Sequence, residues 1–308
     1  MPRGQKAEKA MVPEADFRSY YDRPVLKEPV WSWEVPAYFF AGGLAAGSAM
    51  LAAAADLLGR PDLARRGRIA AAAGATVGGG LLVADLGRPA RFLNMLRVAK
   101  PTSPMSVGSW VLTLFGPAAG IAALSDVLGV FPRAGRVAGL AAGALGPALG
   151  SYTAVLLANT AVPAWHEAGR ELPFLFVGGA SATSGALAVM LAPVGDAAPA
   201  RRLALVGAAM EMSAARAMER NLPEDVAGPY RAGRAGTLTK TAFGLTAAGT
   251  TLIASWGRRR RLGAVVGGAL VMAGALVERY AVMDAGRASA RDPGSTIVPQ
   301  RQRALARE

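Results

Sequence analysis

Eight apolar runs, each about long enough to cross a bilayer as a helix, dominate this sequence. A membrane-spanning helix needs about 20 predominantly apolar residues. The runs are Val35–Leu58, Ile69–Leu86, Ser106–Val130, Val137–Ala161, Leu172–Leu191, Ala200–Met218, Thr237–Trp256 and Leu262–Met283. We therefore expect an all-α membrane protein, with eight transmembrane helices in a bundle and both termini on the same side.

The polarity of the chain changes sharply at both ends of this apolar region. Residues 1–30 form a polar N-terminal arm, residues 31–283 hold all eight runs, and residues 284–308 form a polar C-terminal tail. The sequence thus predicts one transmembrane domain between two polar segments, and the C-terminal tail is expected to be mobile.

Composition excludes several classes of function. Of the 308 residues, 52% are hydrophobic, and Ala and Gly, which let membrane helices approach closely, are abundant. The net charge of +13 lies in loops between apolar runs, a pattern of membrane topology that argues against nucleic acid as a partner. With no Cys and one His, the chain cannot hold a cysteine-ligated cluster or a haem between two histidines. We expect no haem and no metal in this chain.

Arginine in the short loops predicts the orientation. The loops after the first, third, fifth and seventh runs are short and basic, and membrane proteins keep such loops in the cytoplasm. Their basic residues are Arg60, Arg65, Arg66, Arg68, Arg133, Arg136, Arg201, Arg202 and Arg258–Arg261. We therefore expect a multi-pass protein of the cytoplasmic (inner) membrane with both termini on the outer face.

An acid and a base three residues apart end the second run. Asp85 and Arg88 lie in the sequence DLGRP, followed by a basic amphipathic linker. Charged groups near a membrane span are costly and tend to be paired or functional. Two interpretations stay open: an ion pair that closes a helix end, or a site that handles protons.

Polar side chains gather at the outer ends of several runs. Carboxylates, hydroxyls and aromatic rings beside apolar helix walls are the mixture that a quinone site needs. These candidates are Glu34, Tyr38, Asp85, Arg88, Ser109, Trp110, Tyr152 and Asn159. Each has a structural alternative: Trp31, Trp33, Trp110 and Trp165 are typical of an interfacial aromatic belt, Tyr152 can bond a backbone carbonyl, and Glu278 and Arg279 can extend toward the headgroups.

Glu211 lies in the middle of the sixth run, which Arg216 also interrupts. A carboxyl group at this depth is a candidate proton relay. It also supports an alternative function, that of a secondary transporter or proton channel with Glu211 as its coupling site.

Five segments together resemble the NrfD/PsrC family, the membrane subunits of polysulfide reductase and related complexes. They are YFFAGGLAAGSAM at Tyr38–Met50, DLGRPARFLNML at Asp85–Leu96, SPMSVGSW at Ser103–Trp110, SYTAVLLANTAVPAW at Ser151–Trp165 and ELPFLFVGGASATSGA at Glu171–Ala186. The resemblance implies a haem-free quinol/quinone oxidoreductase subunit that binds menaquinone. It also implies a docked four-cluster, ferredoxin-like iron–sulfur subunit, which exchanges electrons with a molybdenum or tungsten catalytic subunit.

The resemblance also suggests where the quinone lies. Residues at the start of the first run and a tyrosine in the fourth line the family's quinone site, and here these are Glu34 or Tyr38, and Tyr152. This chain differs in having EVPAY where some relatives have Asn and His, and Ala154 where Gly is usual. We assign catalytic roles to Asp85, Glu34 and Tyr152, a possible proton relay to Glu211, and quinone contacts to Tyr38, Arg88, Ser109, Trp110 and Asn159.

Overall fold

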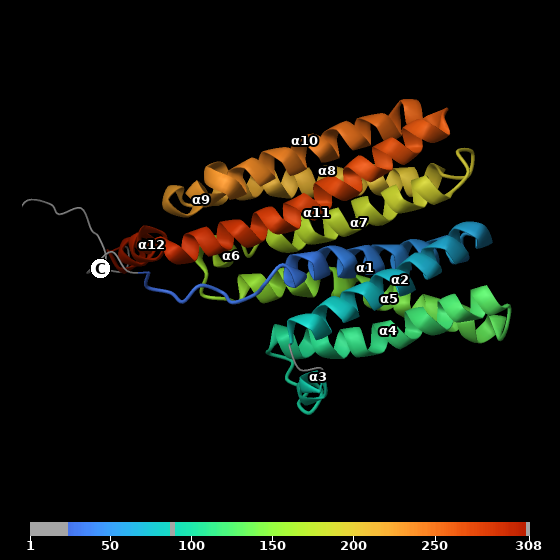
Figure 1. The fold of residues 1–308 in the computed structure, drawn as a ribbon, viewed down its shortest axis with the longest axis horizontal. Coiled ribbons are helices and arrows are strands. Elements are labelled where there is room, and N and C mark those ends of the chain that lie inside the picture. The colour runs from blue at the N-terminus through green and yellow to red at the C-terminus, as the bar shows by residue number, and fades with distance from the viewer. Residues whose placement is uncertain (1–23, 87–89, 306–308) are drawn as a thin grey trace, which may run out of the picture.

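The computed structural model describes residues 24–86 and 90–305, and within these residues the fold is helical, without strands. Eight long helices run alongside one another as an elongated bundle (Figure 1). They are α1 (Glu34–Leu57), α2 (Pro61–Asp85), α4 (Pro104–Leu128), α5 (Pro132–Ala158), α7 (Leu172–Leu191), α8 (Ala198–Asn221), α10 (Gly233–Ala254) and α11 (Arg261–Arg291). Each expected run therefore corresponds to one long helix.

Six of these helices, α1, α2, α4, α5, α7 and α11, are long and apolar enough to cross a membrane. Helices α8 and α10 have 24 and 22 residues, so they are long enough, but they are more polar. Glu211 and Arg216 interrupt α8, and α10 carries Lys240 and several threonines. The structure thus supports a multi-pass membrane protein with six clear candidate spans.

The short helices and the turns divide between the two ends of the bundle. Helices α3 (Arg91–Met95), α6 (Pro163–His166), α9 (Glu224–Arg231) and α12 (Pro293–Leu305) lie at the end where the described chain begins and finishes (Figure 1). The turns that join α1 to α2, α4 to α5, α7 to α8 and α10 to α11 lie at the opposite end, the last through the 3₁₀ turn η2 (Trp256–Arg258). The short basic loops therefore share one end of the bundle.

Proline and glycine set the helix ends at these turns. Pro61 and Pro132 occupy the first turns of α2 and α5, where a missing N–H costs little. Gly59 and Gly129 adopt the left-handed φ values of 67° and 68° after α1 and α4, a conformation that glycine tolerates without strain.

Helix α7 joins two groups of helices. It packs against α1 and α5 on one side and against α8 and α11 on the other. Close approach depends on small residues: a Cβ at Gly47 of α1 would lie 2.4 Å from the carbonyl oxygen of Ala180 in α7, and one at Gly143 of α5 would lie 2.4 Å from the Ala53 Cβ. Gly47 thus lets α1 approach α7 closely, and Gly143 lets α5 approach α1, as the abundance of small residues led us to expect.

A network of charged side chains closes the end of the bundle that carries the short loops. The Arg68 guanidinium lies 3.3 Å from Asp56 and 3.0 Å from Asp126, and Arg136 lies 2.8 Å from Asp56. These residues come from α1, α2, α4 and α5. Arg68, which the topology argument counts only as a loop charge, also joins α1, α2 and α4, and Arg136 adds α5 through Asp56.

Two expectations for the terminal end are wrong. Trp165 is not a belt residue: it is fully buried, its Nε1 donates to the Val282 carbonyl over 2.7 Å, and its ring stacks on Trp31. The last helix does not stop at Met283 but continues to Arg291, because its final turns are buried against the rest of the bundle. Arg291 there contacts Glu28 over 2.6 and 2.8 Å, which holds the pKa of the Glu28 carboxyl below its ordinary value.

Candidate functional site

A cavity of about 560 Å³ lies between α1, α2, α4 and α5, at the end of the bundle where the termini lie. Its walls are mainly apolar, and its volume falls within the roughly 300–1,000 Å³ of small-molecule sites. The lining residues are Trp31, Val35, Tyr38, Phe39, Leu82, Asp85, Leu86, Arg91, Phe92, Asn94, Met95, Met105, Gly108, Ser109, Leu112, Tyr152 and Leu156. We call this space the first cavity.

Two tyrosine hydroxyls meet at the wall of the first cavity. Tyr38 of α1 and Tyr152 of α5 are hydrogen-bonded to each other through their hydroxyl groups, although 114 positions separate them in the sequence. Tyr38 is only 2% exposed. In such a pair one O–H donates to the other oxygen, so the second O–H is free to donate to a ligand oxygen. The pair thus offers a positioned donor in an apolar space.

Glycine makes the room for these two rings. A Cβ at Gly108 of α4 would lie 2.1 Å from Cε2 of Tyr152, far closer than any ordinary contact. On the other ring, a Cβ at Gly78 of α2 would lie 3.3 Å from Cδ2 of Tyr38. Gly108 therefore fixes the depth to which the Tyr152 ring sits between α4 and α5.

Two carboxylates meet one hydroxyl at the rim of the cavity. Asp85, the last residue of α2, is exposed and lines the cavity. The Ser32 hydroxyl lies 3.2 Å from its Oδ1 and is also hydrogen-bonded to the Glu34 carboxylate. Because one O–H can donate to only one acceptor at a time, Ser32 can alternate between the two acids. Glu34 does not itself line the cavity, but Ser32 brings it next to Asp85.

The other predicted residues lie in different places. Ser109 lines the cavity, but its hydroxyl donates to the Met105 carbonyl over 2.8 Å. Trp110 is outside the described lining, and its Nε1 lies 3.4 Å from the Val98 carbonyl, so it holds the loop after α3. Asn159 is an exposed residue at the C-terminal end of α5, and Arg88 lies outside the described residues.

Sequence reasoning missed one wall of the cavity. The short helix α3 contributes Arg91, Phe92, Asn94 and Met95, which cover the side between α2 and α4. The sequence signal was present, because the linker after Asp85 is basic and amphipathic. Phe92 and Met95 face the cavity, whereas Leu93 is exposed, and Arg91 and Asn94 add polar groups to the lining that Asp85 also contributes to.

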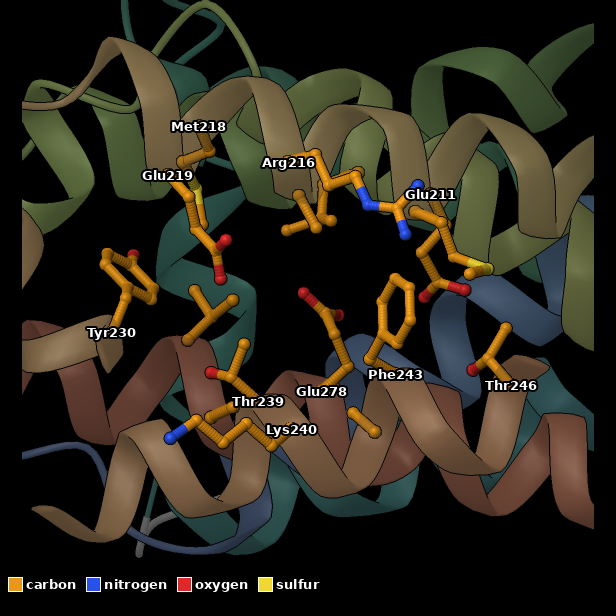
Figure 2. Close-up of a pocket in the computed structure, with 16 residues that line it drawn as sticks. Glu211, Arg216, Met218, Glu219, Tyr230, Thr239, Lys240, Phe243, Thr246 and Glu278 are labelled. Carbon is orange, nitrogen blue, oxygen red and sulfur yellow. The ribbon is translucent and has the colours of Figure 1, made fainter. Parts of the chain in front are cut away.

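Glu211 lies in a second cavity. This space of about 340 Å³ is bounded by α7, α8, α9, α10 and α11, and Figure 2 shows the carboxyl groups of Glu211 and Glu278 directed into it. Glu211 is therefore separate from the polar residues of the first cavity. Arg279, expected to extend toward the headgroups, is instead 2% exposed and pairs with Glu278 inside the protein.

Comparison with protein families gives one match. The family model described as polysulphide reductase, NrfD, covers residues 24–218. This range includes α1 to α7, most of α8 and every described lining residue of the first cavity. No curated protein matched the chain. Because the match covers more than half of the sequence, the chain belongs to the polysulphide reductase NrfD family, the membrane subunits of quinone-interacting molybdoenzyme complexes.

Proposed function

We propose that this chain is the quinone-reactive membrane subunit of a molybdenum or tungsten oxidoreductase. It exchanges electrons between menaquinone in the membrane and a docked four-cluster iron–sulfur subunit. The observation that carries the proposal is the hydroxyl pair of Tyr38 and Tyr152 inside an apolar cavity of small-molecule size. Family membership supports the same class of complex.

The residues of the first cavity fit a quinone. Phe39, Leu82 and Leu112 supply apolar walls for a ring and an isoprenoid tail, and the tyrosine pair supplies a donor for one carbonyl oxygen. A bound quinone supplies two-electron, two-proton redox chemistry at its carbonyl oxygens. The protein's part is to orient the ring, exclude water from it and bring protons to those oxygens.

Proton exchange is assigned to the rim. Asp85 borders both the cavity and the surface, so it can pass protons between water and a ligand. The Ser32 hydroxyl connects it to Glu34. We propose Arg88 as an ion-pair partner of Asp85 or a contact of the docked subunit. Trp110 and Asn159 remain proposed quinone contacts, although neither lines the cavity.

For the topology we propose eight spans, with α8 and α10 crossing the membrane beside α7 and α11. Glu211 of α8 then faces neighbouring helices at 4% exposure, whereas Arg216 and Lys240 are exposed. We further propose that the short basic turns face the cytoplasm and that the terminal end, with the first cavity and the docked subunit, faces outward. The location is the cytoplasmic membrane.

The test replaces Tyr152 by Phe and measures the ratio of quinol-linked to dye-linked activity in membranes with equal amounts of assembled complex. The variant keeps the ring and loses the hydroxyl. We expect the ratio to fall at least about tenfold, a conservative floor below the roughly 10²–10⁴-fold contribution of positioned proton donors. Tyr280→Phe is the control, because the Tyr280 hydroxyl donates to the Trp33 carbonyl outside the cavity. An unchanged ratio in Tyr152→Phe contradicts the proposal.

A further inference from the structure

The second cavity holds a buried acid that has no partner. Glu211 of α8 is 4% exposed, and in the described part of the chain neither of its carboxyl oxygens has a hydrogen-bond partner. An ionised carboxylate without a partner is very costly away from water, whereas the protonated acid is not. Burial and isolation together therefore favour a Glu211 that carries a proton.

A second acid and one arginine share the same space. Glu278 of α11 lines the cavity and pairs with its neighbour Arg279. The Arg279 guanidinium lies 4.0 Å from the centre of the Phe176 ring, and its Nη2 donates to the Phe176 carbonyl over 3.2 Å. Its charge is thus held between α11 and α7. Counted by themselves, Glu211, Glu278 and Arg279 carry no net charge only when the two acids hold one proton between them; the exposed Arg216 and Lys240 lie farther toward the surface.

Gly179 of α7 lets the two acids share this arginine. A Cβ at that position would lie 2.4 Å from Arg279 Nη2 and 2.6 Å from Glu211 Oε1, so both side chains reach the same glycine. Among the described residues no ion pair joins Glu211 to Arg279, so the guanidinium serves Glu278 and remains within reach of Glu211. A small shift of the guanidinium can therefore move its charge from one acid toward the other.

Charged side chains lead from this pair to the surface at the end of the bundle near α9. Helix α7 contributes no titratable side chain, since its residues Leu172–Leu191 are apolar or hydroxylic. The titratable and charged groups that line the cavity from the other helices are Arg216 and Glu219 of α8, Tyr230 of α9, Lys240 of α10 and Glu278 of α11 (Figure 2). Arg279 of α11 adds its guanidinium beside Glu278. Arg216 and Lys240 are exposed, so they mark the mouth of the cavity.

We propose that the second cavity is a proton-holding site, in which Glu211 and Glu278 share one exchangeable proton beside Arg279. The donor set favours a proton over a metal ion. Within residues 24–86 and 90–305 no three His, Cys, Asp or Glu side chains come together as metal ligands, and the two acids already face a guanidinium. The site is separate from the first cavity and does not depend on what that cavity binds.

The test uses dicyclohexylcarbodiimide, an apolar reagent that adds a protonated carboxylic acid across its C=N bond and leaves ionised carboxylates unmodified. Membranes with the complete complex are treated, and the modified peptides are identified by mass spectrometry. We expect modification at Glu211 that declines as the pH is raised. Asp126, paired with Arg68 at the other end of the bundle, is the internal control and should remain unmodified.

Two variants probe the sharing of the proton. Glu278→Gln frees Arg279 for Glu211, so modification of Glu211 should fall about tenfold or more, because an opposite charge within about 4–6 Å favours the ionised form by roughly one to three powers of ten. Asp126→Asn, the matched control, should leave the modification of Glu211 unchanged. If Glu278→Gln leaves the modification of Glu211 unchanged, as the control does, the two acids do not share a proton and the proposal is overturned.

The modification pattern of the wild-type complex tests the proposal even if a variant does not assemble. Absence of modification at both glutamates, or modification that does not change with pH, overturns the proposal. Protection by sodium chloride but not choline chloride at constant pH also overturns it, and assigns the site to an alkali cation. Neither readout needs quinone turnover, so failure here is distinguishable from failure of the proposed function.

Discussion

Gly108→Ala is a small change that should disable the first cavity. The added Cβ would lie 2.1 Å from Cε2 of Tyr152, whereas ordinary contacts begin at 3.4 Å, so the ring must move by about 1.3 Å. This displacement takes the Tyr152 hydroxyl away from Tyr38 and from any ligand that it binds. A misplacement of about 1 Å can reduce turnover about 10²-fold. We expect that loss in quinol-linked activity and no change in dye-linked activity of the partner enzyme.

Gly120→Ala is the matched control on the same helix, because a Cβ there meets no atom within 4 Å. Both variants raise helix propensity equally, so a difference between them reports the contact with Tyr152. The assay compares quinol and dye activities in membranes with equal amounts of assembled complex. If Gly108→Ala retains the activity of Gly120→Ala, the position of the Tyr152 ring does not matter for turnover, and the reasoning is refuted.

Three other predictions concern the rim, the ion network and the topology. Asp85→Asn should leave the complex assembled and lower the ratio of quinol to dye activity at least about tenfold, whereas an exposed end-cap pair would contribute only about 0–1 kcal/mol and leave the ratio unchanged. Arg68→Ala removes the ion pair of Asp126 and leaves Asp56 with Arg136 alone, so thermal unfolding in detergent should show a loss of about 3–5 kcal/mol, and the more exposed Arg136→Ala should lose no more than about 1 kcal/mol. Alkaline phosphatase fused after α12 should be active and a fluorescent protein fused there dark, and the reverse pattern would contradict the orientation.

The approximate positions of the long helices could be predicted because each contains an apolar run of about the length of a membrane span. The run Leu172–Leu191 is α7 to the residue, while α2 begins at Pro61, eight positions before the predicted run, since its first turns carry charges that pair with other helices. Hydropathy does not register such turns, because Arg68 is polar in sequence yet buried in the network with Asp56 and Asp126.

The candidate site was only partly predictable. Tyr38, Asp85, Ser109 and Tyr152 were expected near one another and all line the first cavity. The contact between the two tyrosine hydroxyls depends on how α1 and α5 are rotated, and no local pattern determines that rotation. The role of α3 was missed although the linker after Asp85 is amphipathic, because no pattern in the sequence shows that this five-residue helix packs over the cavity.

The second cavity, too, could be predicted only in part from the sequence. Glu211 was recognised because an acid in an apolar run is unusual, but Glu278 and Arg279 lie near a polar chain end and look like surface residues in sequence. Their position inside the protein follows from the packing of α11 on α7, where Arg279 lies over the Phe176 ring, donates to the Phe176 carbonyl and pairs with Glu278. Only the folded chain shows that both acids face one space.

The most direct test of the account is to locate the quinone by photo-crosslinking. The complete complex in native membranes is illuminated with an azido-labelled menaquinone, and the modified peptides are mapped with and without excess unlabelled quinone. The account predicts competed labels in α1 around Tyr38, in α4 around Gly108 and in α5 around Tyr152. Competed labels confined to α8, α10 and α11 around the second cavity would contradict it.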